Sequence, residues 1–560
     1  MENTNEKTPV LAMYDVRGIQ KYIFKTPKVK DARGASVIVE TIIDDAMNDA
    51  VAKIKKQAEY QNISEDLEWC NNAEAKQYSS GNTKDIQVLF VGGGNASYLF
   101  SDKDLCIEIN KLMSKYVIQN TYSLQLAAAF VEKTDDYKED YKKLQQTMTE
   151  VKAKMVNSVP LGTLPIMKIE QKTGYPIQCP KQGDALGERT KRESESISEE
   201  TRLKRAALQS KVSEKEKEDR TDRKFDSYTT KKGTDSNLAV VHIDGNNMGL
   251  RIRALIEDIT DYEKAVKQMR EISYNINQGY KSVFDEMSDY FNRFGIADDK
   301  SKNFVLKILV AGDDITYICN AGIAIETVRY FCDRIVSKTM IHTDDPKSDV
   351  DGYGFSVCAG IAYFTSHFPF SIAYEVAESC CDKAKKRAKE HSQNGRVANY
   401  LDYQICKNIQ TLDLDKVRSA EYHTHSGEKL IRRPYYISIG MENNAKNSYQ
   451  DFENNESDLH KLSELMNAIK YFRDEKNIPR SLSKKLRNLY PEGESVVGSF
   501  TDFLKSRNHK MPDGSFEMYC KDMIIEKEKE KEIKVAKWYD ALELMDYCEE
   551  QLELYEEGGK

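Results

Sequence analysis

The strongest constraint on the fold of this chain is an internal repeat of one strand, helix and strand pattern. An apolar strand ends at an aspartate twice, in residues 10–15 and again in residues 238–244. A helical stretch follows each time, and a second apolar strand then enters a glycine-containing turn, at residues 91–95 and 310–314. Self-similarity of this kind indicates that one αβ unit is present in two copies.

The two copies also agree beyond the turn. A short strand follows, at residues 96–100 and 315–319, and a helix then leads to another strand, at residues 124–131 and 355–364. Each copy ends with a helix rich in Lys and in Ala or Glu. Chance likeness between small αβ units is the alternative, but the shared order of elements favours duplication. We therefore expect an α+β protein with two related αβ domains.

Composition limits the classes of protein to which the chain can belong. Its 560 residues exceed one hydrophobic core, so about two to four domains are expected. The net charge of −8, from 83 basic and 91 acidic residues, argues against a globally basic nucleic-acid binder. No apolar run approaches the ~20 residues that cross a bilayer, and residues 1–8 lack a signal-peptide core. The 11 cysteines include no C-x-x-C pair, which favours free thiols in a reducing cytoplasm.

The rest of the chain consists of a linker and a C-terminal region. Residues 181–237 hold almost no apolar clusters and many charges, so we expect a solvated linker, part helix and part disordered. Beyond residue 400 the pattern is mainly helical, notably at 458–472 and 535–555, with a charged helical face or loop at 526–534. The predicted division is 1–160 and 237–400 for the two αβ domains, 161–236 for the linker region and 401–560 for a mainly helical domain.

Three carboxylates are expected to meet at one edge of the second αβ domain. Asp313 and Asp314 lie at the tip of a β-hairpin whose turn contains Gly312, and Asp244 ends a neighbouring strand. Like charges brought together cost free energy, so a divalent cation is their natural partner, and oxygen ligands favour Mg²⁺ or Mn²⁺. Two such ions would bind triphosphate oxygens and activate a hydroxyl. Aspartate is also common in plain turns, but the order of elements favours a metal site.

Several segments, in the correct order, resemble one family. Residues 243–249 (IDGNNMG) resemble the D-G-D-N-M-G segment of the large palm-containing subunits of type III CRISPR effector complexes, and residues 311–314 (AGDD) resemble their G-G-D-D motif. Residues 14–24 (YDVRGIQKYIF) are similar to the opening of the family's first palm, and residues 358–385 to its later strand and helix. The resemblance covers most of residues 9–400. Diguanylate cyclases of the G-G-D-E-F type share the palm but lack the opening signature.

The resemblance implies two ferredoxin-like palm domains, of which the second joins ATP molecules 3′ to 5′ into cyclic oligoadenylates. By motif position, Asp244 and Asp313 would bind the two metal ions, and Asp314 would support metal binding or take the proton of the 3′-hydroxyl. Lys385 belongs to a basic run on the closing helix, where it could reach a phosphate or simply be solvated. The predicted nucleotide contacts of this domain are Gly245, Asn246, Asn247, Gly312 and Lys385.

The chain departs from the family pattern at several points. Asn246 stands where the family often has a second Asp, which removes one possible ligand, and Ala311 replaces the first Gly of the palm motif. The family's nuclease domain carries a His-Asp doublet that this chain lacks, so we expect a smaller form without DNA-cutting activity. The stretch 161–236 would hold only a remnant of the family's zinc module, because Cys179 is the only cysteine nearby.

The first copy carries glycine and asparagine where the second has its paired aspartates. A single carboxylate, Asp15, cannot hold two metal ions. This copy is therefore expected to be structural, or to bind a second nucleotide without activating it. The turn glycines Gly92, Gly93 and Gly94 would let a base or ribose approach closely, although a turn needed only for packing would use the same residues.

Three functions remain open at this stage. The leading hypothesis is a cytoplasmic enzyme that condenses NTPs, with ATP as the expected substrate, into a cyclic di- or oligonucleotide messenger in antiviral defence. The second is a scaffold subunit of an RNA-guided complex with little catalysis of its own, and the third is a GTP-using diguanylate-type cyclase. Expected partners are the subunits of a CRISPR-type ribonucleoprotein with guide and target RNA, or a second copy of the chain, and no membrane.

Overall fold

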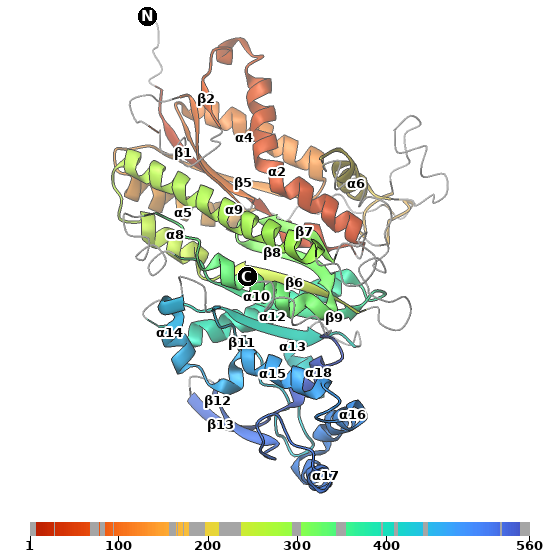
Figure 1. The fold of residues 1–560 in the computed structure, drawn as a ribbon. Coiled ribbons are helices and arrows are strands. Elements are labelled where there is room, and N and C mark those ends of the chain that lie inside the picture. Colours follow the sequence, from red (N-terminus) through yellow and green to blue (C-terminus); the bar gives the residue numbers. More distant parts are fainter. Residues whose placement is uncertain are drawn as a thin grey trace, which may run out of the picture.

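The structure is a computed structural model of the chain. It describes residues 7–26, 28–67, 78, 84–92, 94–155, 164, 166–171, 173–177, 197–211, 237–293, 304–342, 354–393, 396–407, 413–440, 446–526 and 529–548. No helix among these residues is both long enough and apolar enough to cross a membrane. Figure 1 shows the first αβ copy at one end of the molecule, the second in the middle and the C-terminal region at the other end.

Each copy of the repeat forms one mixed unit of helices and strands. The first module comprises β1 (Val10–Arg17), α1 (Ile19–Phe24), α2 (Val29–Ile54), β2 (Glu65–Asp66), β3 (Ile86–Gly92), β4 (Asn95–Phe100), α4 (Lys103–Thr121), β5 (Gln125–Glu132) and α5 (Tyr137–Lys154). The second module comprises β6 (Asn237–Gly245), α8 (Met248–Ile256), α9 (Tyr262–Arg293), β7 (Val305–Ala311), β8 (Asp314–Asn320), α10 (Ala324–Ile335), β9 (Val357–Thr365) and α12 (Phe370–Glu390).

The two modules have the same sheet topology. The first sheet contains the order β3-β4-β1-β5 and the second the order β7-β8-β6-β9, so both are ferredoxin-like units. Even a register shift recurs, between Val88 and Phe90 in β3 and between Lys307 and Leu309 in β7. The predicted α+β class is confirmed, and the shared topology supports the duplication inferred from sequence.

The second sheet is buried on both faces, which explains its unbroken apolar strands. Alternate residues of β6 serve different cores: Leu238 and Val240 pack with the first module, whereas Val241 and Ile243 join the core that extends into the C-terminal region. Helix α2 packs against β7, and α9 packs against β3, so the long helix of each module contacts the sheet of the other (Figure 1). The modules therefore form one continuous structure.

Polar side chains of α9 complete the first sheet at its bulge. Arg270 donates two hydrogen bonds to the carbonyl oxygen of Val88, at 2.7 and 3.0 Å. Ser273 and Asn277 donate to the carbonyl oxygen of Val91 at 2.8 and 3.1 Å. A bulge leaves backbone groups unpaired, and these side chains satisfy them. The junction between the modules is thus specific as well as apolar.

The C-terminal region continues the second module. Strand β10 (Tyr400–Ile405) pairs in parallel with β9, and β11 (Tyr435–Tyr436) extends that sheet. The boundary predicted at residue 400 therefore falls at the first residue of a strand of this sheet. The helices that follow are α13 (Leu414–Glu421), α14 (Lys446–Asn455), α15 (Leu462–Arg473), α16 (Arg480–Leu489), α17 (Glu494–Ser506) and α18 (Tyr539–Leu544).

A buried ion cluster joins this region to the sheet. Arg433 has no exposed side-chain surface and contacts Glu543 at 3.1 Å and Asp540 at 3.6 Å. Asp402, on β10, is held by Arg418 of α13 at 2.8 Å. Buried charges are stable only when paired in this way. The cluster therefore fixes α18 against the edge of the second sheet.

Two predictions outside the modules are wrong. Residues 526–534, expected as a charged helix face or loop, belong to the antiparallel pair β12 (Tyr519–Glu526) and β13 (Lys529–Ala536), and residue 535 is therefore in a strand rather than a helix. The reason is that alternating Lys and Glu also fit a solvated two-stranded ribbon, in which Lys521 forms an ion pair with Glu532 of the other strand at 2.9 Å. Residues 527–528 and those beyond 548 lie outside the described residues.

The predicted solvated linker is also partly wrong. Helix α6 (Glu199–Lys211) packs on α2, and the buried amine of Lys204 donates to Glu200 and to the carbonyl oxygen of Tyr22, both at 2.6 Å. A Cβ at Gly34 of α2 would lie 2.0 Å from the carbonyl oxygen of Lys204, so the two helices meet where a glycine removes the side chain. The rest of the predicted linker, 181–196 and 212–236, lies outside the described residues.

Candidate active site

Strand register brings the predicted carboxylates to one edge of the second sheet. Ile243 of β6 pairs with Ile315 of β8, so Asp244 and Asp314, the next residue outward on each strand, lie side by side. Asp313 belongs to the turn between β7 and β8, which Gly312 enters with a φ of 62°. That left-handed conformation favours glycine, so Gly312 is required by the turn itself.

Gly245 makes room for Asp313. A Cβ at this position would lie 2.9 Å from Asp313 Oδ2, 2.8 Å from Tyr280 Oη and 2.6 Å from Met248 Cγ. Side-chain atoms from the turn, from α9 and from α8 therefore converge on the space above one glycine. Any larger residue would displace the Asp313 carboxylate.

Burial and charge make ionisation of this centre costly. Burial raises the pKa of Asp313 to about 7, and the neighbouring Asp244 charge adds to the rise. Burial likewise raises the pKa of Asp314 to about 7, again with help from Asp244. Lys385 of α12 forms an ion pair with Asp244. One lysine does not balance three carboxylates.

The carboxylates fit a divalent cation in chemistry, although their side chains are turned toward other partners. Asp314 Oδ1 and Tyr280 Oη are buried atoms without a hydrogen-bond partner in the described part of the chain. Among the described residues, no three His, Cys, Asp or Glu side chains are already arranged as metal ligands. The unpaired carboxylate oxygen and the excess negative charge are what a hard cation would satisfy. Binding it requires small side-chain rotations.

The first module reaches into this centre through α1. Gln20 donates from Nε2 to Asp314 Oδ2 at 2.7 Å and accepts from the hydroxyl of Tyr374 at 2.6 Å. The ring of Phe24, one turn further along α1, stacks on Tyr374. A polar residue of the first module thus orients an aspartate of the second. The sequence motif contains Gln20, but its role was not predicted, because only the tertiary contact between modules assigns it.

His242 lies beside the same aspartate. Its Nδ1 is 3.1 Å from Thr316 Oγ1 and 3.6 Å from Asp314 Oδ1. Burial lowers the pKa of His242, so the ring is neutral near pH ~7. Its role here is to pack against Tyr374, with the two rings edge to face at 5.7 Å.

The predicted nucleotide contacts of the second module stay predictions, and the structure shows how two of these residues are held. Asn246 is buried, and its amide donates to Ser356 Oγ at 3.2 Å and to the carbonyl oxygen of Ala398 at 3.1 Å. The Asn246 amide therefore joins the end of β6 to two other loops, and its predicted contact with a nucleotide stays a prediction. Asn247 starts α8 in a left-handed conformation with a φ of 55°. Gly93 lies outside the described residues.

The first module repeats one contact of the site. Asp15, two residues before the end of β1, forms an ion pair with Lys152 of α5, as Asp244 does with Lys385 of α12. Gly92 and Asn95 form the corresponding hairpin, and Gly94 has a φ of 89°. The pair of aspartates is missing there, as the sequence predicted. The lysine partner was not predicted, because α5 carries several lysines and the sequence does not show which of them contacts Asp15.

Fold and site together define a palm-type protein, in which two ferredoxin-like modules share an interface and one carries a carboxylate cluster at its hairpin tip. Residues 237–395 match the family model of the Cas10/Cmr2 second palm domain. The resemblance to the large palm subunits of type III CRISPR complexes is thereby confirmed for this part of the chain. No curated protein matches the sequence.

Solved structures are similar to the chain at low identity. The crystal structure of Csm1 in T. onnurineus is 14% identical with a TM-score of 0.47, covering 97% of this chain and 70% of that one. An apo Csm1–Csm4 cassette is 14% identical with a TM-score of 0.44, covering 90% and 66%. A Csm1–Csm4 cassette in complex with AMPPNP is 15% identical with a TM-score of 0.40, covering 68% of this chain and 54% of that one. The chain therefore spans about half the length of that relative.

Proposed function

We propose that the chain is a nucleotidyltransferase that condenses NTPs, with ATP as the preferred substrate, into a cyclic di- or oligonucleotide messenger of antiviral defence. The observation that carries this proposal is the anionic centre at the hairpin tip: Asp313 and Asp314, each with a pKa raised to about 7, lie beside Asp244. A scaffold gains nothing from three converging carboxylates, whereas phosphoryl chemistry needs them to hold cations.

Two Mg²⁺ or Mn²⁺ ions would be held by Asp244, Asp313 and Asp314, and when bound they would neutralise triphosphate charge and lower the pKa of the attacking 3′-hydroxyl. Asp314 would support metal binding or accept the proton from that hydroxyl. Gln20 keeps its carboxylate oriented from the first module. Lys385 is placed to meet a phosphate once Asp244 has a cation as its partner.

The first module would shape the pocket without activating a nucleotide. Its Asp15 is paired with Lys152, and its hairpin offers glycine and asparagine where the second module offers carboxylates. In this proposal Gly92, Gly93 and Gly94 allow a second nucleotide to lie close to the backbone. Assembly with CRISPR-type subunits and RNA, or with a second copy of the chain, belongs to the same proposal.

The test is incubation of the purified protein with each NTP and Mn²⁺ or Mg²⁺, with products identified by mass spectrometry. The double variant Asp313→Ala/Asp314→Ala is expected to make no product, whereas Asn95→Ala, at the matching hairpin position of the first module, is expected to remain active. Product from ATP alone fixes the base, and product from GTP alone would point to a diguanylate-type cyclase. Equal product from wild type and the double variant would contradict the assignment of the site.

A scaffold role is the second candidate, and one observation favours it. Asp244 is ion-paired with Lys385 just as Asp15 is paired with Lys152 in the module that lacks the aspartate pair. A protein that never binds metal would keep such pairs. No product from any NTP, together with no Mn²⁺ binding by calorimetry, would support the scaffold. Mn²⁺ and ATP binding without product would instead indicate that an activating partner is missing.

A further inference from the structure

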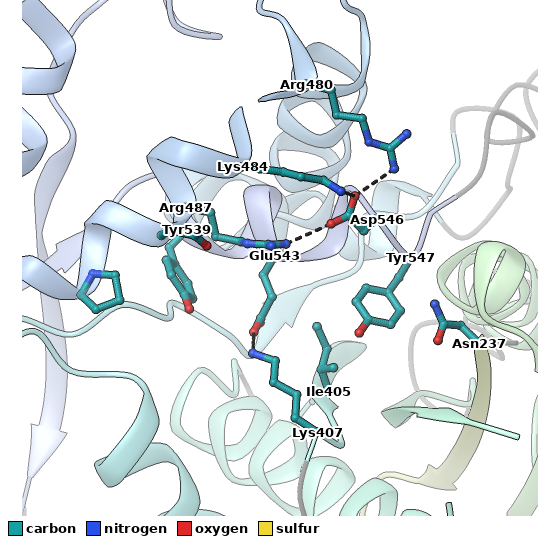
Figure 2. Close-up of a pocket in the computed structure, with 12 residues that line it drawn as sticks. Asn237, Ile405, Lys407, Arg480, Lys484, Arg487, Tyr539, Glu543, Asp546 and Tyr547 are labelled. Carbon is teal, nitrogen blue, oxygen red and sulfur yellow. Dashed lines mark hydrogen bonds and ion pairs between the residues drawn. The ribbon is translucent and has the colours of Figure 1, made fainter. Parts of the chain in front are cut away.

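A pocket of about 560 Å³ lies in the C-terminal region, between α16, α18 and the end of β10 (Figure 2). Its volume is in the range of small-molecule sites, about 300–1,000 Å³. It shares no lining residue with the carboxylate centre. Its lining includes Lys407, Arg480, Lys484, Arg487, Tyr547 and Asp546.

One face of α16 brings three cations to one carboxylate. Arg480 donates to Asp546 Oδ1 at 2.9 Å, Arg487 donates to Oδ2 at 3.0 Å, and the amine of Lys484 lies 3.4 Å from Oδ1 (Figure 2). Burial would raise the pKa of Asp546, but these cations outweigh it and hold the pKa below its ordinary value. A single carboxylate cannot neutralise three cations, so the face keeps surplus positive charge.

The other acid of the pocket does not remove this surplus. Glu543 is buried, accepts from the hydroxyl of Tyr422 at 2.9 Å and is bound by Arg433 at 3.1 Å. Its negative charge therefore serves the buried ion cluster, and Lys407 approaches it only from the pocket side, at 3.1 Å. Lys407 is thus paired with Glu543, and Asp546 is the acid that faces Arg480, Lys484 and Arg487.

The rest of the lining suits a nucleoside. Tyr547 is half-buried, and its ring centroid lies 5.3 Å from that of Tyr363. This contact holds the Tyr547 ring in place at the side of the pocket. Asn237 and Asn488 supply amides that can donate and accept. Aromatic faces stack bases and guanidinium groups bind phosphate oxygens in pairs.

We propose that this pocket binds a phosphorylated ribonucleotide unit, either free or within an RNA strand, with its phosphate on Arg480, Lys484 and Arg487. The phosphate takes the place of Asp546 as the principal anion, and Tyr547 contacts the base. This inference is independent of the proposed catalytic function, because it uses neither the carboxylate centre nor a metal.

Two titrations test it, with the full chain at low salt and EDTA present so that metal-dependent binding at the carboxylate centre does not contribute. AMP is followed by calorimetry, and a fluorescein-labelled ten-uridine RNA is followed by fluorescence anisotropy. The variant Arg480→Gln/Lys484→Gln is expected to bind about ten-fold more weakly, since two charge-assisted contacts are lost. Lys485→Gln, an equal charge change on the same helix but outside the pocket, is the matched control and is expected to match wild type.

A variant with the opposite effect separates lost binding from misfolding. Asp546→Asn frees the three cations and is expected to tighten binding by about three-fold to ten-fold. Binding of AMP alone identifies a free nucleotide as the ligand, and binding of the RNA alone identifies a strand. No binding of either probe to wild type, or the same affinity in wild type and both pocket variants, would overturn the proposal.

Discussion

The two modules have the same fold but differ in the residues at the hairpin turn. Both follow the same strand order, both have a bulge before the hairpin, and both pair a strand-ending aspartate with a lysine of the closing helix. Both start the next helix from a left-handed residue, Gly18 with a φ of 83° and Asn247 with a φ of 55°. Both modules therefore share the backbone that surrounds the site.

The difference lies in which residue fills the space beside the strand end. In the second module that position is Gly245, and the Asp313 carboxylate lies 2.9 Å from where its Cβ would be. In the first module the residue after Asp15 is Val16, and the turn residue is Gly94, whose Cβ would lie 2.3 Å from Ile19 Cδ1. The second module thus has glycine after the strand aspartate and a side chain in the turn, whereas the first module has a side chain after the strand aspartate and glycine in the turn. The first module therefore lacks the carboxylates for two reasons. Its turn residues are glycine and asparagine, and Ile19 fills the space that a side chain at Gly94 would need.

Making the second module like the first at this point should have the largest effect. Gly245→Val would collide with Asp313 Oδ2 and Tyr280 Oη, at 2.9 and 2.8 Å from the new Cβ, and displace the carboxylate. We expect the yield of cyclic product to fall about 100-fold. Mass spectrometry of products and Mn²⁺ calorimetry measure it. Val16→Ala in the first module is the control, and it should cost about 1–2 kcal/mol of stability while activity persists.

Making the first module like the second should damage the fold without creating a site. Gly94→Asp places a side chain at a φ of 89° and into Ile19, so we expect about 2–4 kcal/mol of destabilisation in urea unfolding. Asn95→Asp, on the exposed neighbouring residue, should change stability by less than about 0.5 kcal/mol. A Gly94→Asp protein of wild-type stability that binds additional Mn²⁺ would show that the packing argument is wrong.

The two aspartate–lysine pairs should respond differently to the same mutation. Lys385→Met leaves Asp244 beside two further carboxylates, so half-saturation with Mn²⁺ at fixed concentration should move up by about one pH unit. Lys152→Met removes a pair whose side chains are 37% and 29% exposed, and it should cost at most about 1 kcal/mol. Calorimetry across pH and urea unfolding measure the two effects. Identical pH curves for both variants would contradict a charged centre confined to the second module.

Part of the pH dependence of metal-free stability should come from the carboxylate centre of the second module. The pKa of Asp313 rises from 3.8 to about 7 on folding, so the folded chain holds a proton that the unfolded chain has lost. Stability from this group is complete below the lower value and is lost as pH rises through about 7. With Asp314 25% exposed, solvent offsets part of its share, and we expect a decline of about 1 kcal/mol between about pH 6 and 8.

That decline is measured by urea unfolding in EDTA. Asp313→Asn/Asp314→Asn should flatten it, because neither amide titrates. Asn95→Ala in the first module should leave the slope as in wild type. A slope that survives in the double asparagine variant would assign the titration to another group.

Local sequence patterns were sufficient to predict the two modules. Apolar runs ending at Asp15 and Asp244, each followed by a hairpin turn, fix strands and register, and register alone places Asp244 beside Asp314. The match of residues 237–395 to a palm family agrees with that prediction. What could be predicted is what depends on neighbours in sequence.

The predictions that failed depend on contacts between distant residues. Lys204 was expected in solvated linker because its neighbours are charged, but Glu200 and the carbonyl oxygen of Tyr22 satisfy its amine inside the protein. The amide of Asn246 is held by Ser356 and Ala398, more than 100 residues away in sequence, and its neighbours in sequence give no sign of these contacts. Gln20 was passed over for the same reason, since its partners belong to the other module.

The buried Arg433 has a consequence for how the protein is made. Its carboxylate partners Asp540 and Glu543 are more than 100 residues further along the chain, although β10 and β11 are complete well before them. During synthesis Arg433 has Asp402 beside it, at 4.0 Å, but lacks its two further carboxylate partners until α18 has left the ribosome. Folding of this half of the molecule is therefore tied to the end of translation of residues 539–544, whereas the first module needs no such late arrival to pair its own strands.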